Sequence, residues 1–331
     1  MSKAKAISEA MSKRPTNLSA PIFLVGSERS GTTLLRLMLN FHPEITWLNE
    51  FEYAVGMVSD KGKYPNLENY YRWLETHRIF QMSEMSIDRS LAYPELVNSF
   101  LQQRLETFQK PLVGATVHHH FDRLLKIWPD AKFIHIVRDP RAVSRSCVIQ
   151  GWAGNVWVGL SRWITAERTW EKMRPQLAPE NQLEIRYQDL VVNNREVLGQ
   201  VCNFIGVDYS EKMLDYIHTT DYGLPDPTLI HSWRTKLGKR DIQLVEARVG
   251  KRMVERGYAL SGYAPLKLSA LDKLYLKAQS RFARLAFRVK RYGFGLVLGD
   301  FVTRRLGSSE WNKPYRLKIN EIQLQHLKKS W

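Results

Sequence analysis

The segment 26–33 has a composition suited to binding an anion. It reads Gly-Ser-Glu-Arg-Ser-Gly-Thr-Thr and lies between an apolar run at 21–25 and a run of helix formers at 33–40. Backbone N–H groups at a helix N-terminus carry a partial charge of roughly +0.5 and bind phosphate-like groups. The arginine and the hydroxyl side chains add further donors. The sequence therefore predicts a phosphate site between a strand and a helix, with a plain connecting turn as the alternative.

The glycine spacing of this segment is that of the phosphate loop of NTPases, GxxxxGK[ST]. Gly26, Gly31 and Thr33 occupy three of its defined positions, but Thr32 stands where the lysine belongs. Because that lysine reaches the β- and γ-phosphates, its replacement argues against an ATPase or GTPase. A P-loop kinase or NTPase-like enzyme stays the first alternative function. We expect Arg29 to supply the missing cation.

An arginine and a serine that are chemically suited to binding a second phosphate follow the apolar run at 132–137. Arg138 comes directly after this run, and Ser146 lies eight residues later in a segment expected to be helical, 142–149. A strand end can deliver a guanidinium fork to a phosphate, and a serine of the next helix can donate its hydroxyl from the other side. The alternative is a local ion pair between Arg138 and Asp139.

In these motifs the sequence resembles the sulfotransferase family, whose members transfer sulfuryl groups from 3′-phosphoadenosine 5′-phosphosulfate (PAPS). The family's 5′-phosphosulfate loop corresponds to 29–33. Its 3′-phosphate site, an arginine after a strand and a serine eight residues later, corresponds to Arg138 and Ser146, the second phosphate-binding pair. Its Tyr-Glu-Asp segment corresponds to Tyr187-Gln-Asp-Leu190, in which Gln188 replaces the glutamate. The resemblance extends over about 21–205. It implies that the following residues contact the cofactor: Arg29, Ser30, Gly31, Thr32, Thr33, Arg138, Ser146 and Tyr187.

The resemblance also implies a reaction. PAPS is the sulfuryl donor, PAP is the product, no metal is required, and the acceptor presents a hydroxyl, with carbohydrates, lipids and glycolipids favoured. Arg29 is expected to stabilise charge on the transferring group, because positioning and charge stabilisation dominate the related phosphoryl transfers. The protein would then be a PAPS-dependent O-sulfotransferase. A non-enzymatic, membrane-associated nucleotide-binding protein is the second alternative.

Glu50 is the first candidate for the general base. It lies 21 residues after Arg29, which is the spacing of the catalytic glutamate in the tyrosylprotein branch of the family. A general base contributes about 10²- to 10⁴-fold in rate, and Glu52 could share the role. His118 is the rival, because the cytosolic branch uses a histidine upstream of its 3′-phosphate strand. The triplet 118–120 would also suggest a metal site, but adjacent residues of a strand or helix do not all face one point.

Strands and helices are expected to alternate along the first two-thirds of the chain. Apolar runs predict strands at 21–25, 132–137 and 182–187, and helix-forming segments follow them at 33–40, 142–149 and 195–205. This order predicts an α/β fold with a P-loop-like parallel sheet and helices on both faces. Residues 55–110 are expected to be helical and rich in aromatics, either as an insertion that completes the core or as a substrate wall or lid.

The composition is that of a packed globular protein. Of 331 residues, 44% are hydrophobic and 25% are charged, which excludes wholesale disorder. Two cysteines are too few for a disulfide framework. Residues 1–20 are expected to be a mobile polar lead-in without the apolar centre of a secretory signal, and no apolar stretch reaches the ~18 residues of a membrane span. We therefore expect a cytoplasmic protein with one domain at 21–262 and a basic helical tail at 263–331.

The net charge of +16 is concentrated in this tail. Residues 266–331 contain 15 Lys or Arg and 4 Asp or Glu, a net charge of +11. Six basic residues recur at helical spacing: Lys273, Lys277, Arg281, Arg284, Arg288 and Arg291. Apolar residues that include Leu271, Leu274 and Leu285 run beside them. The pattern predicts an amphipathic helix that either docks on the core or contacts a membrane surface.

The charge predicts an anionic partner. An acidic membrane surface, contacted through 266–331, is the candidate, and the protein would then be peripheral to the membrane. Nucleic acid is not expected, because the sequence contains no recognition motif for it. The sequence leaves open whether the protein forms an oligomer.

Overall fold

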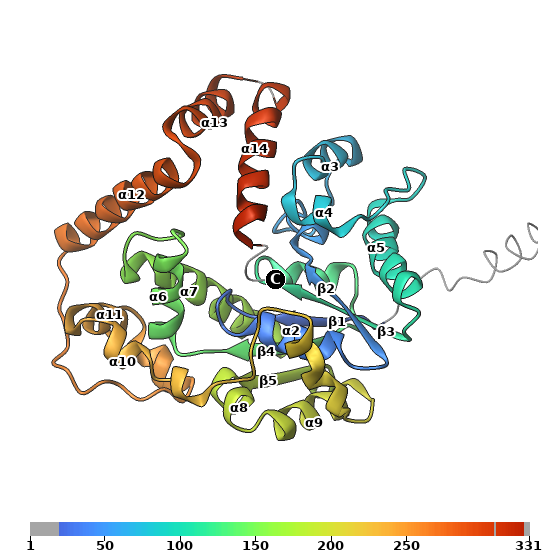
Figure 1. Ribbon diagram of the computed structural model, residues 1–331, viewed down its shortest axis with the longest axis horizontal. Helices are drawn as coiled ribbons and strands as arrows, with labels where there is room; N and C mark the ends of the chain where they lie inside the picture. The colour runs from blue at the N-terminus through green and yellow to red at the C-terminus, as the bar shows by residue number, and fades with distance from the viewer. Residues whose placement is uncertain (1–19, 308, 328–331) are drawn as a thin grey trace, which may run out of the picture.

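The computed structural model of the chain describes residues 20–307 and 309–327 (Figure 1). Its centre is a five-stranded parallel sheet with the strand order β2-β3-β1-β4-β5. The strands are β1 (Ile22–Val25), β2 (Ile45–Glu50), β3 (Leu112–Val117), β4 (Lys132–Val137) and β5 (Gln182–Arg186). The predicted α/β fold with a parallel sheet is confirmed. The predicted lead-in lies outside the described residues except for Ala20.

Helices cover both faces of the sheet. They are α2 (Thr32–Asn40), α3 (Leu67–Leu74), α4 (Arg78–Ser83), α5 (Tyr93–Phe108), α6 (Pro140–Ile149), α7 (Val156–Met173), α8 (Tyr187–Val192), α9 (Asn194–Ile205), α10 (Trp233–Lys236) and α11 (Lys239–Glu255), before the tail helices described below. One face of the sheet packs against α2 and α9, and the other packs against α3, α5 and the end of α7. β1 is buried along its whole length. A strand covered on both faces has a continuously apolar sequence, which is why the run at 21–25 predicted it.

The segment 55–110 is helical, as predicted, and most of its aromatic side chains lie in the core. Tyr70, Tyr93 and Phe100 are buried. The hydroxyls of Tyr70 and Tyr93 donate to the carbonyl oxygens of Tyr53 and Ala54 at 2.8 and 2.9 Å. The segment therefore completes the core, and its helix α4 also forms a wall of the pocket described below.

Three strands differ from the prediction. β2 and β3 had no counterpart among the predicted strands. β5 ends at Arg186, so Tyr187 begins α8 instead of ending the strand. The predicted cap of α9 is present, since Gly206 follows the helix with a φ of +98°, the conformation that commonly ends helices.

The tail contains three helices, α12 (Ala270–Tyr292), α13 (Phe294–Leu306) and α14 (Ser309–Leu327). In Figure 1 they form an arch, in which α12 and α13 lead to the top of the view and α14 returns toward the centre. α14 contacts the end of α3 and the residues that follow it. Lys313 Nζ lies 2.5 Å from Glu75 Oε2, and Asn320 donates to the carbonyl oxygen of Thr76 at 3.0 Å. Within the described residues, no helix has both the length and the apolar character needed to cross a bilayer.

Candidate active site

The carboxyl ends of the five strands carry nearly all of the predicted site residues. Glu50 ends β2, His118 follows β3, the loop at 26–31 follows β1, Arg138 follows β4, and Tyr187 follows β5. The carboxyl ends of parallel strands meet at one edge of a sheet, where α/β proteins bind ligands. The strand order places the candidate bases on one side of the loop, and Arg138 and Tyr187 on the other. The site therefore has a base-bearing half and an anion-binding half.

The loop between β1 and α2 is shaped by residues with positive φ, namely Gly26 (+140°), Arg29 (+70°) and Gly31 (+98°). A Cβ on Gly26 would lie 2.5 Å from the carbonyl oxygen of Ile136, so glycine is required where the loop passes β4. α2 begins after Gly31 without a side-chain cap, and the first N–H groups of a helix have no partner within it. The Ser30 hydroxyl is buried and has no partner among the described residues. A phosphate-like anion fits this loop, because it would accept from the hydroxyl and from the N–H groups.

Arg29 joins the loop to the second phosphate-binding pair. Its Nε donates to Ser146 Oγ at 2.8 Å, and Arg138 Nη1 donates to the carbonyl oxygen of Arg29 at 3.0 Å. Two motifs that are far apart in the sequence thus form one site. Asp139 pairs with Arg141 at 2.7 Å instead of forming the ion pair with Arg138 that was the alternative. The Arg138 guanidinium is therefore directed toward the loop.

Tyr187 forms one wall of the anion-binding half. The Arg138 guanidinium lies 4.0 Å from the centre of the Tyr187 ring, a cation–π distance. The ring also fills the space beside Gly31, where a Cβ would lie 2.2 Å from it. Trp163 Nε1 donates to the carbonyl oxygen of Arg138 at 3.0 Å and fixes the end of β4. Burial lowers the pKa of Arg138, but a guanidinium stays charged at neutral pH.

A second segment lines the same pocket as the loop, Arg138 and Tyr187. Its lining residues are Tyr222, Gly223, Leu224, Pro225, Asp226 and Leu229. Sequence reasoning missed this segment. Its glycine and prolines indicate a loop, but their types carry no signal of a ligand, so only the fold could place them at the site.

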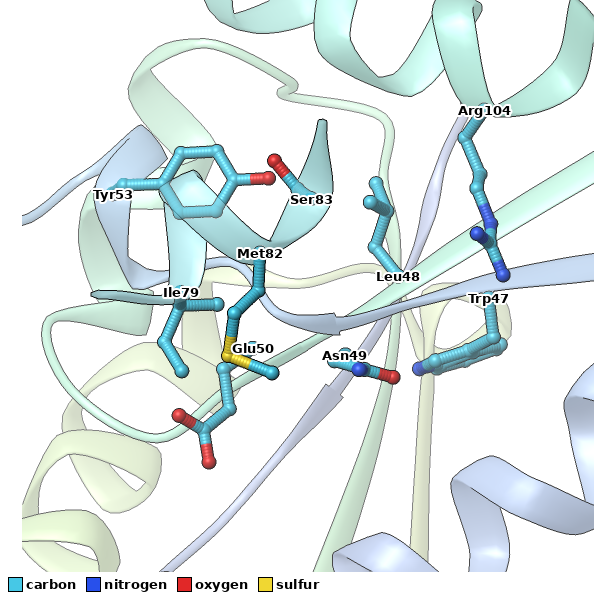
Figure 2. Close-up of a pocket in the computed structure, with 9 residues that line it drawn as sticks. All are labelled: Trp47, Leu48, Asn49, Glu50, Tyr53, Ile79, Met82, Ser83 and Arg104. Atoms are coloured by element: carbon cyan, nitrogen blue, oxygen red, sulfur yellow. The ribbon is translucent and has the colours of Figure 1, made fainter. Parts of the chain in front are cut away.

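A pocket beside Glu50 lies between β2 and α4 (Figure 2). Figure 2 shows the apolar side chains of Ile79 and Met82 close to the Glu50 side chain. Arg104 of α5 lies over Trp47 at the other end of the pocket. The pocket therefore offers apolar walls, a cation and a carboxylate to a second substrate.

The end of β2 is irregular where it delivers Glu50. The register of β2 on β3 shifts between Leu48 and Glu50, which is a bulge at Asn49. Bulges re-aim side chains and are frequent beside active sites. The Asn49 side chain accepts a hydrogen bond from Arg36. Burial lowers the pKa of Arg36 to about 10, and the nearby charge of Glu50 acts in the opposite direction.

Glu52 and His118 lie between Glu50 and the loop. Glu52 Oε1 accepts from the backbone N–H of His118 at 2.7 Å. Burial and the charge of Glu50 raise the pKa of Glu52 well above its usual range. His118 Nδ1 lies 3.0 Å from the carbonyl oxygen of Gly26. Because a carbonyl only accepts, Nδ1 carries the proton and Nε2 is the basic nitrogen. The structure therefore places Glu52 next to both candidate bases, Glu50 and His118.

The side chains of the histidine triplet diverge. His119 Nε2 lies 2.8 Å from Glu28 Oε1, and Arg162 also contacts Glu28. Burial opposes ionisation of Glu28. The His119 hydrogen bond and the charges of His118, His119 and Arg162 outweigh burial and hold the pKa of Glu28 at about 2. His120 is exposed, and its backbone has a φ of +56°. Among residues 20–307 and 309–327, no three His, Cys, Asp or Glu residues are grouped as metal ligands. Sequence reasoning missed the Glu28–Arg162 pair.

A parallel sheet whose central strand leads through a glycine-flanked loop into an uncapped helix defines a P-loop-like α/β protein, a class whose carboxyl edge suits a phosphorylated ligand. The model of the sulfotransferase family matches residues 21–211. The chain therefore belongs to the sulfotransferase family, as the resemblance at 21–205 predicted.

Relatives and solved structures agree with this assignment. The chain is 27% identical over 226 residues to protein-tyrosine sulfotransferase 1 of Danio rerio, which covers 60% of this chain and 59% of the relative. It is 24% identical over 210 residues to protein-tyrosine sulfotransferase 2 of Gallus gallus, which covers 59% of this chain and 53% of the relative. The chain thus spans little more than half the length of these relatives. A sulfotransferase domain from the curacin biosynthetic pathway has the same fold, with a TM-score of 0.52 at 20% identity over 74% of this chain and 99% of that one.

Proposed function

We propose that this chain is a PAPS-dependent sulfotransferase that transfers a sulfuryl group to the hydroxyl of an acceptor. The observation that carries the proposal is the hydrogen bond from Arg29 to Ser146, which joins two anion-binding motifs 117 residues apart. A ligand with phosphates at two ends matches two such motifs in one site. Membership of the family, and relatives named protein-tyrosine sulfotransferases, support the same reaction.

The anion-binding half would hold the nucleotide. The loop binds the 5′-phosphate through the first N–H groups of α2 and the hydroxyls of 30–33. Arg138 and Ser146 bind the 3′-phosphate, and Tyr187 lies against the adenine. The buried, unpartnered Ser30 hydroxyl supports the role of the loop. PAPS supplies the activated sulfuryl group when bound, and PAP leaves as the product.

The base-bearing half would activate the acceptor. The reaction breaks the bond between sulfur and the bridging phosphate oxygen and forms a bond between sulfur and the acceptor oxygen. Glu50 takes the hydroxyl proton as general base. Arg29 stabilises the charge that develops on the bridging oxygen. The basic nitrogen of His118, whose position depends on Glu52, is the second candidate for the base.

The acceptor would enter through the pocket beside Glu50. Ile79 and Met82 supply apolar contacts, while Asn49 and Arg104 supply polar ones. Such a mixed wall suits a molecule with both hydroxyls and apolar groups, which supports carbohydrate, lipid and glycolipid acceptors. Since adjacent apolar and polar walls are what a glycolipid requires, this class is the first to screen.

The first test is a thermal-shift titration with PAP, ATP and ADP, each with and without magnesium. A ligand at about 100 times its Kd stabilises the fold by about 2.7 kcal/mol. We expect PAP alone to stabilise the protein strongly, and to do so without magnesium.

The Arg138→Ala variant should weaken PAP binding by ~1.5–3 kcal/mol, the value of a charged hydrogen bond. The control Arg195→Ala, which removes an exposed ion pair with Glu211, should leave PAP binding unchanged.

Two outcomes would contradict the proposal. Stabilisation by magnesium-ATP alone would favour the P-loop NTPase. Binding of PAP without transfer of label from radiolabelled PAPS to any hydroxyl acceptor would favour the non-enzymatic nucleotide-binding protein.

A further inference from the structure

Helix α12 touches the rest of the protein along one narrow face. Leu276 and Ser280 are its buried side chains. Asn155 Nδ2 donates to the carbonyl oxygen of Leu276 at 2.7 Å, and the Gly154 N–H donates to Ser280 Oγ at 2.9 Å. Most of the remaining surface of this 23-residue helix is exposed.

The opposite face of α12 is apolar and exposed. Its bulky side chains are Leu271, Leu274, Tyr275, Phe282 and Leu285, with exposed fractions from 50% to 77%. At 100° per residue they lie on one side of the helix, about half a turn from Leu276 and Ser280. A surface helix normally packs its apolar stripe on the core. Here the apolar stripe faces outward, so core docking does not account for it.

A basic flank borders this apolar face. Its exposed side chains are Lys273, Lys277, Arg281 and Arg284. The single acidic residue of α12, Asp272, is bound at the start of the helix, 2.7 Å from the Ser269 hydroxyl. The flank therefore presents positive charge without acidic neighbours of its own helix.

Helix α13 also carries exposed apolar side chains. Phe294, Leu298, Phe301, Val302 and Leu306 have exposed fractions from 40% to 82%. The acidic residue of this helix, Asp300, is buried and bound by Arg288 of α12 at 2.8 Å and by Arg304. This contact ties α13 to α12 and neutralises the carboxylate.

We propose that the outer surface of α12 and α13 binds the surface of an anionic lipid bilayer. Apolar faces flanked by Lys and Arg lie in the membrane interface, with bulky side chains among the acyl chains and cations at the headgroups. Each basic residue near an anionic leaflet adds about 1 kcal/mol, roughly a fivefold factor in affinity. Large exposed apolar patches are rare on monomeric proteins and mark interaction sites. This inference goes beyond sulfuryl transfer and does not depend on it.

The test is co-sedimentation of the full chain with phosphatidylcholine vesicles, with and without phosphatidylserine. We expect binding to the vesicles that contain phosphatidylserine, and weaker binding at high salt. Phe282→Ser/Leu285→Ser and Lys277→Glu/Arg281→Glu should each weaken binding by at least about tenfold. The matched control is Lys251→Glu/Val254→Ser on α11, where both side chains are also exposed, and it should bind like the wild type. Equal melting temperatures show that each variant is folded.

Three results would overturn the proposal. The first is no sedimentation of the wild type with anionic vesicles. The second is equal binding to neutral and anionic vesicles, or binding that neither α12 variant changes. The third is a lipid-free dimer, seen by analytical ultracentrifugation, that Phe282→Ser/Leu285→Ser dissociates, since a second copy of the chain would then cover this face.

Discussion

At the scale of single residues, Gly31 is the point where the phosphate loop and Tyr187 come closest. A Cβ at Gly31 would lie 2.2 Å from the Tyr187 ring, and the backbone has a φ of +98°. A residue with a side chain pays about 1–2 kcal/mol for a left-handed conformation, and the clash adds to this. We expect Gly31→Ala to lower PAP affinity at least about tenfold, measured by calorimetry.

The matched control is Gly199→Ala in α9, where a Cβ would meet nothing within 4 Å. This variant should bind PAP normally and raise the unfolding free energy by roughly 0.5–1 kcal/mol, as expected for glycine in a helix interior. Normal PAP affinity in Gly31→Ala would mean that the loop does not hold the nucleotide.

The choice of base is also a question about single residues. Glu50→Gln keeps the shape of the side chain but removes its ability to take a proton. We expect PAP affinity to be retained and turnover of radiolabelled PAPS with an acceptor to fall at least ~10²-fold. His118→Gln is the comparison. If Glu50→Gln turns over almost normally while His118→Gln does not, His118 is the base.

The sequence indicated the candidate site residues that belong to local motifs and missed those that depend on the fold. The loop, Arg138, Ser146 and Tyr187 were recognisable because short spacings carry them. Glu28 and Arg162 contact each other across 134 residues, and no short spacing could reveal that. The same limit applies to the segment that contributes Tyr222. Only the folded structure places this segment beside the loop and Arg138.

At the scale of elements, a buried ionic network ties α7 and α11 to the sheet. His135 of β4 lies between Glu184 of β5 at 3.0 Å and Glu167 of α7 at 3.3 Å. Arg256, which follows α11, contacts Glu167 at 2.6 Å. The ring of His135 stacks on Trp170, with the ring centres 4.6 Å apart. Removing one member would leave buried charge unpaired, which is strongly destabilising.

This network predicts how stability depends on pH. Burial opposes protonation of His135, but Glu167 and Glu184 outweigh it and raise its pKa above the ordinary 6.5. The contribution of His135 to the unfolding free energy is therefore full below pH 6.5. It is lost as the pH rises through the raised pKa of His135. Burial opposes ionisation of Glu184, but His135 and Arg256 lower its pKa from 4.5 to about 2. That contribution is full above pH 4.5 and is lost as the pH falls toward 2.

We expect the unfolding free energy, measured by urea titration, to be highest between about pH 4.5 and 6.5 as far as this network is concerned. His135→Gln should lower it and flatten the decline on the alkaline side. The exposed His218 gives the control His218→Gln, which should leave the profile unchanged. An alkaline decline of the same steepness in His135→Gln would show that other groups cause it.

Among the elements, the sequence pattern within each strand decided whether it could be predicted. β1 is covered on both faces and is continuously apolar, and β4 is buried from Phe133 to Val137 and apolar there except for His135. β2 lies at the edge of the sheet and contains Thr46, Asn49 and Glu50, which break the apolar pattern. β3 contains Gly114, and the Trp47 ring occupies the place of its Cβ, 2.1 Å away. A glycine weakens a strand pattern, and the ring that explains it belongs to another strand.

At the scale of the whole molecule, Gly154 allows helix α12 of the tail to pack closely against the residues before α7. A Cβ there would lie 2.6 Å from the Cβ of Ala283 and 2.7 Å from the Cα of Ser280. We expect Gly154→Leu to push α12 away from the residues before α7. Overpacking costs ~1–3 kcal/mol. We therefore expect about a tenfold larger population of molecules in which α12 is detached, and faster proteolysis between α11 and α12. Gly199→Leu, at a position with open space, should not change the cleavage rate.

The strand order also has a consequence for synthesis of the chain. β1 is made first but lies in the middle of the sheet, and its partners begin only at Leu112 and Lys132. At roughly 5 to 20 residues per second of translation, its apolar sequence waits about 4 to 20 seconds for a partner. A ribosomal pause between β1 and β3 would prolong this exposure, whereas a pause after β5 would find the sheet already complete. Chaperones that bind nascent chains are therefore expected to act on the first hundred residues.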